Sequence, residues 1–170
     1  MTDPSAPGGL ELPAPLNRER AIFEFNRRGG RVAYGTDDNY IWATPGFSNI
    51  RELQLLRETG MHTLEVLKAA THNAAETLRQ PRLGLVHPGY LADLVIVDGN
   101  PNYNLRFLYS FGALTLDHDG KMYRTKGPVY TIKDGIVIDD HKLMDEVARM
   151  VAESKKGVGP NVATQPFVVP

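Results

Sequence analysis

The chain has 170 residues, enough for one hydrophobic core and too few for most two-domain enzymes. Its net charge of -1, from 19 basic and 20 acidic residues, excludes a strong field that would attract nucleic acid or an anionic membrane. Cysteine is absent, which excludes disulfides, thiolate nucleophiles and cysteine-ligated zinc. The sequence shows neither a membrane-spanning apolar run nor a basic and apolar leader, so we expect a cytoplasmic protein.

The first third of the chain predicts a helix followed by a strand. Residues 1–16 are rich in proline and glycine, so we expect an irregular lead-in. Residues 17–30 have helical apolar spacing, with Asn17 as the expected N-cap and a pair of glycines as the stop. The apolar segment RVAYGTD, residues 31–37, then reads as a short buried strand.

The middle of the chain predicts two more helices. Residues 48–60 have apolar positions at helical spacing. Ser48 or Asn49 is the expected cap, and the glutamate three residues after Asn49 imitates a capping box. Residues 62–78 form the second predicted helix, beginning at His62.

Beyond Pro81 the pattern changes from helical to strand-like. The apolar run Leu94 to Val97 predicts a strand that Asp98-Gly99-Asn100-Pro101 ends. The segment 129–139 predicts a hairpin around Asp134-Gly135, and residues 113–123 predict a surface hairpin or loop around Asp119-Gly120. An amphipathic helix from residue 141 and a tail with glycine and proline complete the chain.

One acidic residue lies where α/β proteins place their chemistry. Asp37 closes the predicted strand at its carboxyl end, where a carboxylate can ligate a metal or act as a general base. The same position also suits a helix cap or an Asx turn. Tyr40 and Trp42 follow at once, and they either line the mouth of a substrate site or pack the loop onto its own fold.

The histidines show no metal-binding pattern. None occurs in an H-x-H or H-E-x-x-H motif, and ten residues separate His62 from His72, which places them roughly 80° apart around one helix. We therefore expect no metal role for any of the five, which are His62, His72, His87, His118 and His141.

Five phrases in a fixed order resemble the C-terminal third of a metal-dependent amidohydrolase, of the imidazolonepropionase-like and prolidase-like branch. They are GTDD (35–38), RELQLLRETGM (51–61), EVLKAATHNAAETL (65–78), LGLVHPGYLADLVIVDGNP (83–101) and YTIKDGIVID (130–139).

The resemblance implies an α/β fold: the terminal segment of a (β/α)8 TIM-barrel amidohydrolase plus the returning strands of a small β-sandwich. Residues 17–80 would be the last helix–strand–helix units of the barrel. Residues 81–140 would be sandwich strands, and residues 141–170 a C-terminal helix and tail. Asp37 matches the family aspartate that ligates a divalent metal, zinc in the complete parent protein, and moves a proton from water to the leaving nitrogen.

The family's other metal ligands have no counterpart in the sequence. A catalytic zinc takes about three protein ligands, and a complete barrel takes about 250 residues. We therefore expect a C-terminal fragment of a hydrolase acting on carbon–nitrogen bonds of amides, cyclic amides or dipeptides. Alone it would be inactive and hold no metal tightly, and it would require the missing barrel portion or a homo-oligomer. The alternative is a non-catalytic protein-interaction module.

Overall fold

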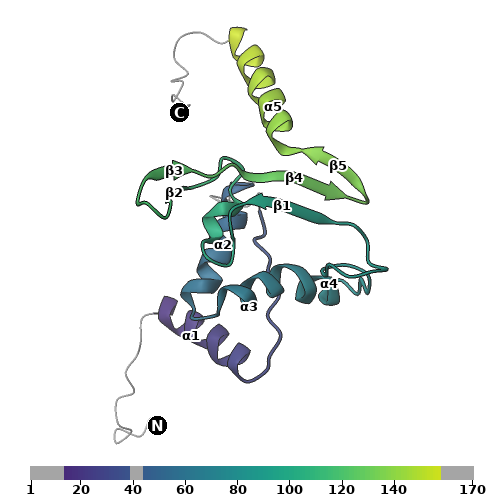
Figure 1. Cartoon of the computed structure of the whole chain (residues 1–170). Helices are drawn as coiled ribbons and strands as arrows, with labels where there is room; N and C mark the ends of the chain where they lie inside the picture. Colours follow the sequence, from purple (N-terminus) through teal and green to yellow (C-terminus); the bar gives the residue numbers. More distant parts are fainter. Residues whose placement is uncertain (1–13, 39–43, 158–170) are drawn as a thin grey trace, which may run out of the picture.

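The computed structural model describes residues 14–38 and 44–157 (Figure 1). Four α-helices precede all the strands along the described chain, and one long α-helix follows them. The helical part comes first, with α1 (Ala14–Arg27), α2 (Phe47–Glu58), α3 (Thr63–Lys68) and α4 (Ala74–Thr77). No helix in the described ranges is long and apolar enough to cross a bilayer.

Three strands form the main antiparallel sheet. These are β1 (Leu94–Asp98), β4 (Gly127–Lys133) and β5 (Ile136–Asp139), in the order β1-β4-β5. In Figure 1, β1 is the strand of this sheet nearest to α1–α4, and β5 is the one farthest from them. The β4–β5 turn at Asp134-Gly135 has φ values of 52° and 80°, and this pair of left-handed residues suits the twist of a tight hairpin, as the sequence predicted.

A second hairpin leaves the sheet. It pairs β2 (Leu114–Leu116) with β3 (Met122–Arg124) around Asp119-Gly120, so this hairpin prediction is also confirmed. The Asp117 carboxylate accepts hydrogen bonds from the backbone N–H groups of Asp119 and Lys121, at 3.0 Å and 2.8 Å. A short 3-10 helix, η2 (Leu105–Leu108), connects β1 to this region.

The buried core lies among the helices. It joins side chains of α2, α3, the turn between them, the π-helix η1 (Ala69–Asn73) and η2. Its members are Leu53, Leu56, Met61, Val66, Ala69 and Leu105. Among the described residues nine apolar side chains are buried, whereas twenty-five large apolar ones are more than a third exposed. A chain with this balance leaves much apolar surface for other contacts.

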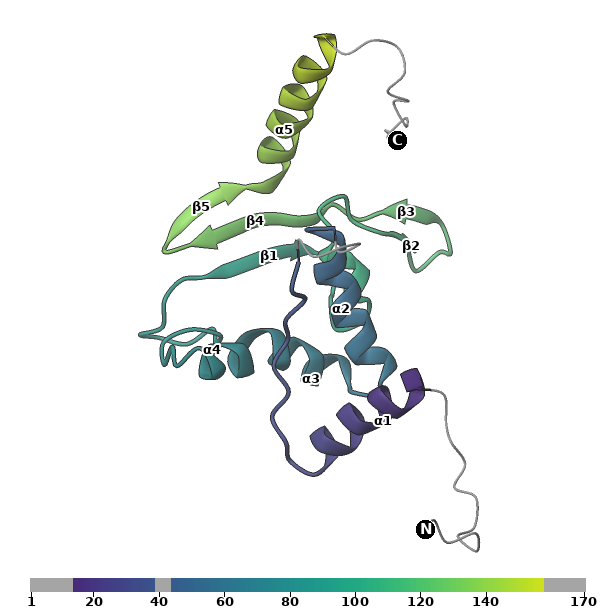
Figure 2. The same ribbon diagram turned by 180° about the vertical axis from the view of Figure 1, so that it is seen from behind.

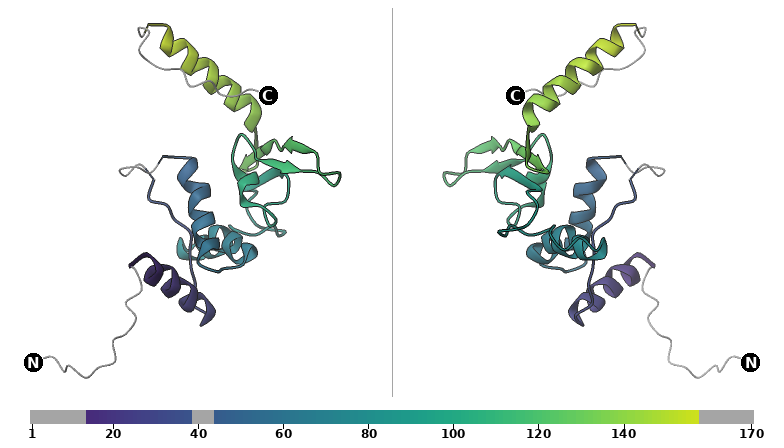
Figure 3. Two further views of the ribbon diagram at one scale, coloured as in Figure 1. Left: turned by 90° about the vertical axis from the view of Figure 1, so that its left-hand side faces the viewer. Right: turned by 90° about the vertical axis from the view of Figure 1, so that its right-hand side faces the viewer.

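The final helix projects from the molecule. Helix α5 (Asp140–Ser154) continues directly from β5 and ends in a 3-10 turn, η3 (Lys155–Gly157). Figures 2 and 3 show it extending from the far side of the sheet, away from α1–α4. All of its side chains are at least partly exposed, because the helix contacts β4 and β5 only near its beginning.

Two predicted helix starts are wrong. Helix α1 begins at Ala14, so Asn17 lies inside the helix and part of the expected lead-in is helical. Helix α2 begins after Gly46, whose φ of 87° turns the chain into the helix without a side-chain cap. Ser48 and Asn49 bond elsewhere: the Ser48 hydroxyl donates to the Thr44 carbonyl oxygen and the Asp38 carboxylate. The His62 start is confirmed, with the His62 N–H donating to the Glu65 carboxylate over 2.7 Å.

The segment 31–37 is not a strand in the structure. It runs between α1 and α2 without helix or strand geometry. The Tyr34 N–H donates a backbone hydrogen bond to the Ala69 carbonyl oxygen, which belongs to a helix and not to a strand. A strand exists only through a hydrogen-bonded neighbour, and the main sheet of the described chain lies elsewhere. An apolar sequence rich in β-forming residues can thus favour an extended backbone without providing the neighbouring strand that a β-ladder requires.

Candidate functional site: the segment that carries Asp37

A π-helical turn in the second helical stretch holds the extended segment. Helices α3 and α4 are joined by η1 (Ala69–Asn73), a π-helix within one continuous helix. A π-turn displaces the regular ladder and releases a backbone carbonyl for other partners. The Ala69 carbonyl oxygen accepts a hydrogen bond from the Tyr34 N–H over 3.1 Å, and the Asn73 amide donates to the Val32 carbonyl oxygen over 2.7 Å.

Helix α2 holds the same segment from the other side. The Asn49 side-chain oxygen accepts hydrogen bonds from the Tyr34 hydroxyl and the Thr36 hydroxyl, each at 3.0 Å. Burial raises the pKa of the Tyr34 phenol, so Tyr34 stays a neutral donor at physiological pH. Tyr34 is therefore anchored at both its backbone and its side chain, and Thr36, the residue before Asp37, is anchored at its side chain.

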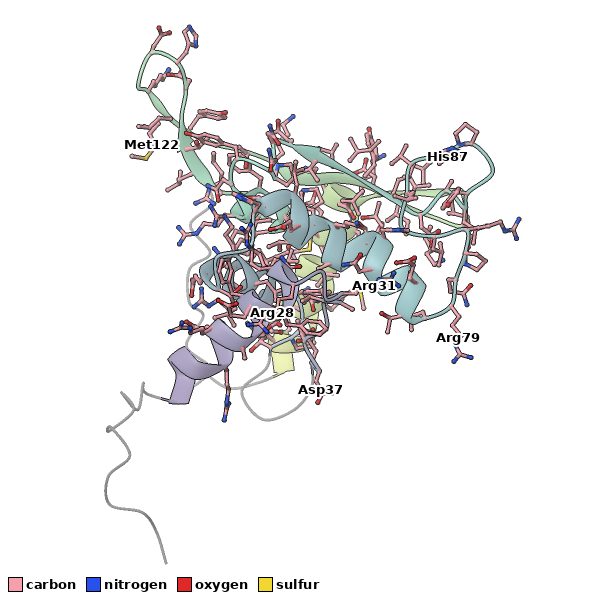
Figure 4. All side chains as sticks on the ribbon, turned by 90° about the horizontal axis from the view of Figure 1, so that it is seen from below. Arg28, Arg31, Asp37, Arg79, His87 and Met122 are labelled. Carbon is pink, nitrogen blue, oxygen red and sulfur yellow. The ribbon has the colours of Figure 1, made fainter. Side chains whose placement is uncertain are left out.

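Asp37 lies at the exposed end of this anchored segment. Its φ of 51° is left-handed, a conformation that aspartate tolerates better than most residues. The residue is exposed, and Figure 4 shows its side chain at the margin of the molecule, directed away from the ribbon. The anchors therefore fix the backbone of a carboxylate that faces outward and is open to a reactant or to further protein.

His72 belongs to a different group of charged side chains from Asp37. His72 in η1 is within 3.7 Å of the Glu76 carboxylate, which also pairs with Arg31 at 3.0 Å. These three residues help to line a pocket beside α4, and Asp37 does not contribute to its lining. No group of three or more histidine, aspartate or glutamate side chains in the described ranges is placed to hold a metal.

The structure also identifies residues that sequence reasoning missed. Asn49 was expected to cap α2 and instead fixes Tyr34 and Thr36, while the π-turn at η1 leaves no signature in the sequence. Near the start of α2, the rings of Phe47, Tyr109 and Phe111 meet at centroid distances of 5.4 to 5.6 Å. Tyr40 and Trp42, the predicted substrate contacts, lie outside the described residues.

Comparison with known proteins decides the family. A model of the amidohydrolase family matches residues 17–140, most of the chain. The chain belongs to the amidohydrolase family. The match ends where α5 begins, so Asp37 and the main sheet fall within the family region and nearly all of α5 falls beyond it.

Curated sequences similar to this chain include adenine deaminases. The chain is 34% identical over 101 residues to the enzyme of Geobacillus kaustophilus (strain HTA426), a match that covers 58% of this chain and 17% of the relative. It is 39% identical over 72 residues to the enzyme of Serratia proteamaculans (strain 568), covering 42% of this chain and 12% of the relative. The matches thus span about a sixth or less of these relatives.

A solved structure supports the same placement. The chain resembles the crystal structure of a Xaa-Pro dipeptidase with methionine bound in its active site, at 26% identity and a TM-score of 0.54. The match covers 73% of this chain and 25% of that one. The fold of this chain therefore resembles about a quarter of that longer protein.

Proposed function

We propose that this chain supplies the C-terminal part of a hydrolase that acts on carbon–nitrogen bonds. The observation that carries the proposal is the anchored presentation of Asp37, within the region that matches the amidohydrolase family. Hydrolysis of a C–N bond needs a group that takes a proton from water and returns it to the leaving nitrogen. We assign this role to the Asp37 carboxylate.

The architecture follows from the same proposal. The segment 31–37 takes the place of the last strand of a (β/α)8 barrel, where neighbouring strands would supply the ladder that it lacks here. The strands between residues 81 and 140 belong to a small β-sandwich. The exposed apolar side chains on the helices, Leu64 and Leu78 among them, support this reading, because they suit contacts with the rest of a barrel.

Amidohydrolases generally use a divalent metal, and the described residues alone do not fit one. A catalytic zinc takes about three protein ligands, whereas no cluster of three such side chains occurs in the described part of this chain. We therefore route no chemical step through a metal here. The remaining ligands of the complete site come from beyond the described residues, and the isolated chain is expected to be inactive.

The relatives suggest which substrates to test. Adenine deaminases release ammonia from a heterocyclic amine, and a Xaa-Pro dipeptidase cleaves before proline; both are C–N bonds. The 170-residue chain can be added to a Geobacillus kaustophilus adenine deaminase from which the matched segment has been removed. We expect ammonia release from adenine to be restored by the wild-type chain and not by Asp37→Asn.

Two controls make the complementation experiment decisive. Asp119→Asn makes the same chemical change at the exposed tip of the β2–β3 hairpin and is expected to restore activity fully. Each variant is compared with the wild type by circular dichroism. Restored activity with Asp37→Asn would contradict the assigned role, as would hydrolysis of adenine or Xaa-Pro dipeptides by the isolated chain at equal rates with and without Asp37.

A further inference from the structure

Helix α5 carries a continuous apolar stripe that no described element covers. At 100° per residue its large apolar side chains occupy an arc of about 120° centred on Val147. They are between 43% and 70% exposed, and they are Leu143, Met144, Val147, Met150 and Val151. The arc is as wide as the core-facing side of an ordinary buried helix.

The first turn of α5 is hydrogen-bonded to the sheet, and these bonds set the direction in which the apolar stripe faces. The Asp139 carboxylate accepts a hydrogen bond from the Lys142 N–H over 3.1 Å and caps the helix. The Thr131 hydroxyl of β4 donates to the Asp140 carboxylate over 3.1 Å. Beyond this first turn the helix projects away from the sheet (Figure 3).

The stripe does not belong to the hydrolase region. The family match ends at residue 140, the first residue of α5. The helix also points away from the helices that carry the Asp37 segment (Figures 1 and 2). A surface needed to complete the catalytic part would be expected within the matched region, so the apolar stripe calls for another occupant.

The charges of the helix indicate what that occupant is. Residues 139–146, the N-cap and first half of α5, carry four carboxylates and one lysine, whereas residues 149–156, the end of α5 and the start of η3, carry three cations and one glutamate. Two copies of the helix placed antiparallel would set each acidic half against a basic half, and a parallel pair would set like charges together. The same distribution favours the helix dipole, but the dipole gives no reason for an apolar stripe.

We propose that α5 pairs antiparallel with α5 of a second copy of this chain, about a twofold axis at Val147. This register places Leu143 level with Val151 of the second copy. A twofold contact is self-complementary, which is the requirement that the charge pattern meets. The inference does not depend on the proposed hydrolase activity.

The size of the contact sets the expected affinity. Fifteen residues of helix are about 22 Å long, so the pair buries less than a standard protein interface. The exposed apolar residues Ile136 and Val137 of the edge strand β5 lie directly before the helix and can enlarge the contact. We expect a monomer–dimer equilibrium with a dissociation constant in the micromolar range.

Sedimentation equilibrium of the 170-residue chain tests the pairing. Val147→Glu places a carboxylate at the centre of the stripe and should raise the dissociation constant roughly tenfold or more. Ala152→Glu adds the same group on the opposite side of the helix and should leave it nearly unchanged. Circular dichroism shows whether both variants keep the helix. A chain that stays monomeric up to sub-millimolar concentration overturns the proposal, and so does a dimer that tolerates Val147→Glu.

Cysteine cross-linking tests the orientation, since the chain has no cysteine of its own. Facing residues on the twofold axis come within the Cα separation of about 4.4 to 6.8 Å that a disulfide requires. We therefore expect Val147→Cys to cross-link to its own copy on oxidation. Leu143→Cys and Val151→Cys should cross-link to each other when mixed, and each far less when alone. Efficient self-linking of all three variants would indicate a parallel pair and overturn the antiparallel arrangement.

Discussion

The Asn49 side-chain oxygen accepts a hydrogen bond from the Tyr34 hydroxyl over 3.0 Å, and it joins helix α2 to the segment that ends in Asp37. The same oxygen accepts from Thr36, one residue before Asp37. One amide therefore fixes the approach to the candidate catalytic carboxylate, which makes Asn49 a positioning residue with a measurable effect on both stability and activity.

Asn49→Ala should destabilise the chain and slow the complemented enzyme. The Thr36 hydroxyl loses its acceptor, whereas the Tyr34 hydroxyl keeps the backbone carbonyl oxygen of Asn49 at 3.2 Å. A half-buried unpaired donor costs about 1–3 kcal/mol of unfolding free energy. Urea unfolding measures the loss, with the exposed Asn102→Ala as the matched control. Adding Tyr34→Phe and Thr36→Val to Asn49→Ala should cost less than the sum of the separate changes, because the bonds to the Asn49 side-chain oxygen are counted in more than one of them. Simple additivity would show that Asn49 acts in another way.

Two glycines near the β2–β3 hairpin are expected to tolerate alanine to different degrees. Gly112 and Gly120 both have positive φ, 64° and 76°, so both substitutions strain the backbone by about 1–2 kcal/mol. A Cβ at Gly112 would also lie 1.8 Å from the Thr125 carbonyl oxygen, while a Cβ at Gly120 would meet nothing within 4 Å. Urea unfolding should show a markedly larger loss for Gly112→Ala; equal losses would contradict the packing of this loop.

The start of α3 predicts an acid-dependent loss of stability. The His62 N–H and, secondarily, the Asn26 amide donate to the Glu65 carboxylate and hold its pKa below the usual range. A depressed pKa contributes stability that is present above the unfolded value and is lost as the pH falls through the folded value. Stability should therefore drop between about pH 5 and pH 3, and the drop should be smaller in Glu65→Gln.

The control for this pH dependence is Glu153→Gln, on the exposed α5. It removes the same charge without touching the start of α3, so its unfolding curve against pH should follow that of the wild type. An unchanged acid slope in Glu65→Gln would contradict the assigned capping role.

The hairpins could be predicted from the residue types at their turns, whereas the hydrogen bonds that anchor the segment before Asp37 could not. The pairs Asp119-Gly120 and Asp134-Gly135 predict tight turns, because aspartate and glycine tolerate left-handed φ values. Both hairpins form at these pairs. The predicted side-chain cap of α2 is wrong because the helix begins after Gly46, whose backbone is left-handed. The Asn49 side chain instead accepts a hydrogen bond from the Tyr34 hydroxyl. A serine or asparagine near a helix start carries no mark of which bond it makes.

The segment 31–37 shows the second limit of local sequence. Its apolar alternation fixes an extended chain, but a strand depends on neighbours, and here the π-turn at Ala69 provides the partner for Tyr34. The position of Asp37 at the end of that segment was predictable, because it followed from the order of residues alone. The geometry that holds it was not, because no pattern marked the π-turn.

The most direct measurement of the central claim is zinc titration of the 170-residue chain after chelator treatment, followed by calorimetry. We propose that Asp37 is one member of a site whose other ligands lie beyond the described residues. We therefore expect no tight zinc binding by the isolated chain, and the same weak response from Asp37→Asn. One tightly bound zinc per chain that disappears in Asp37→Asn would contradict this proposal, because the chain would then hold a complete site of its own.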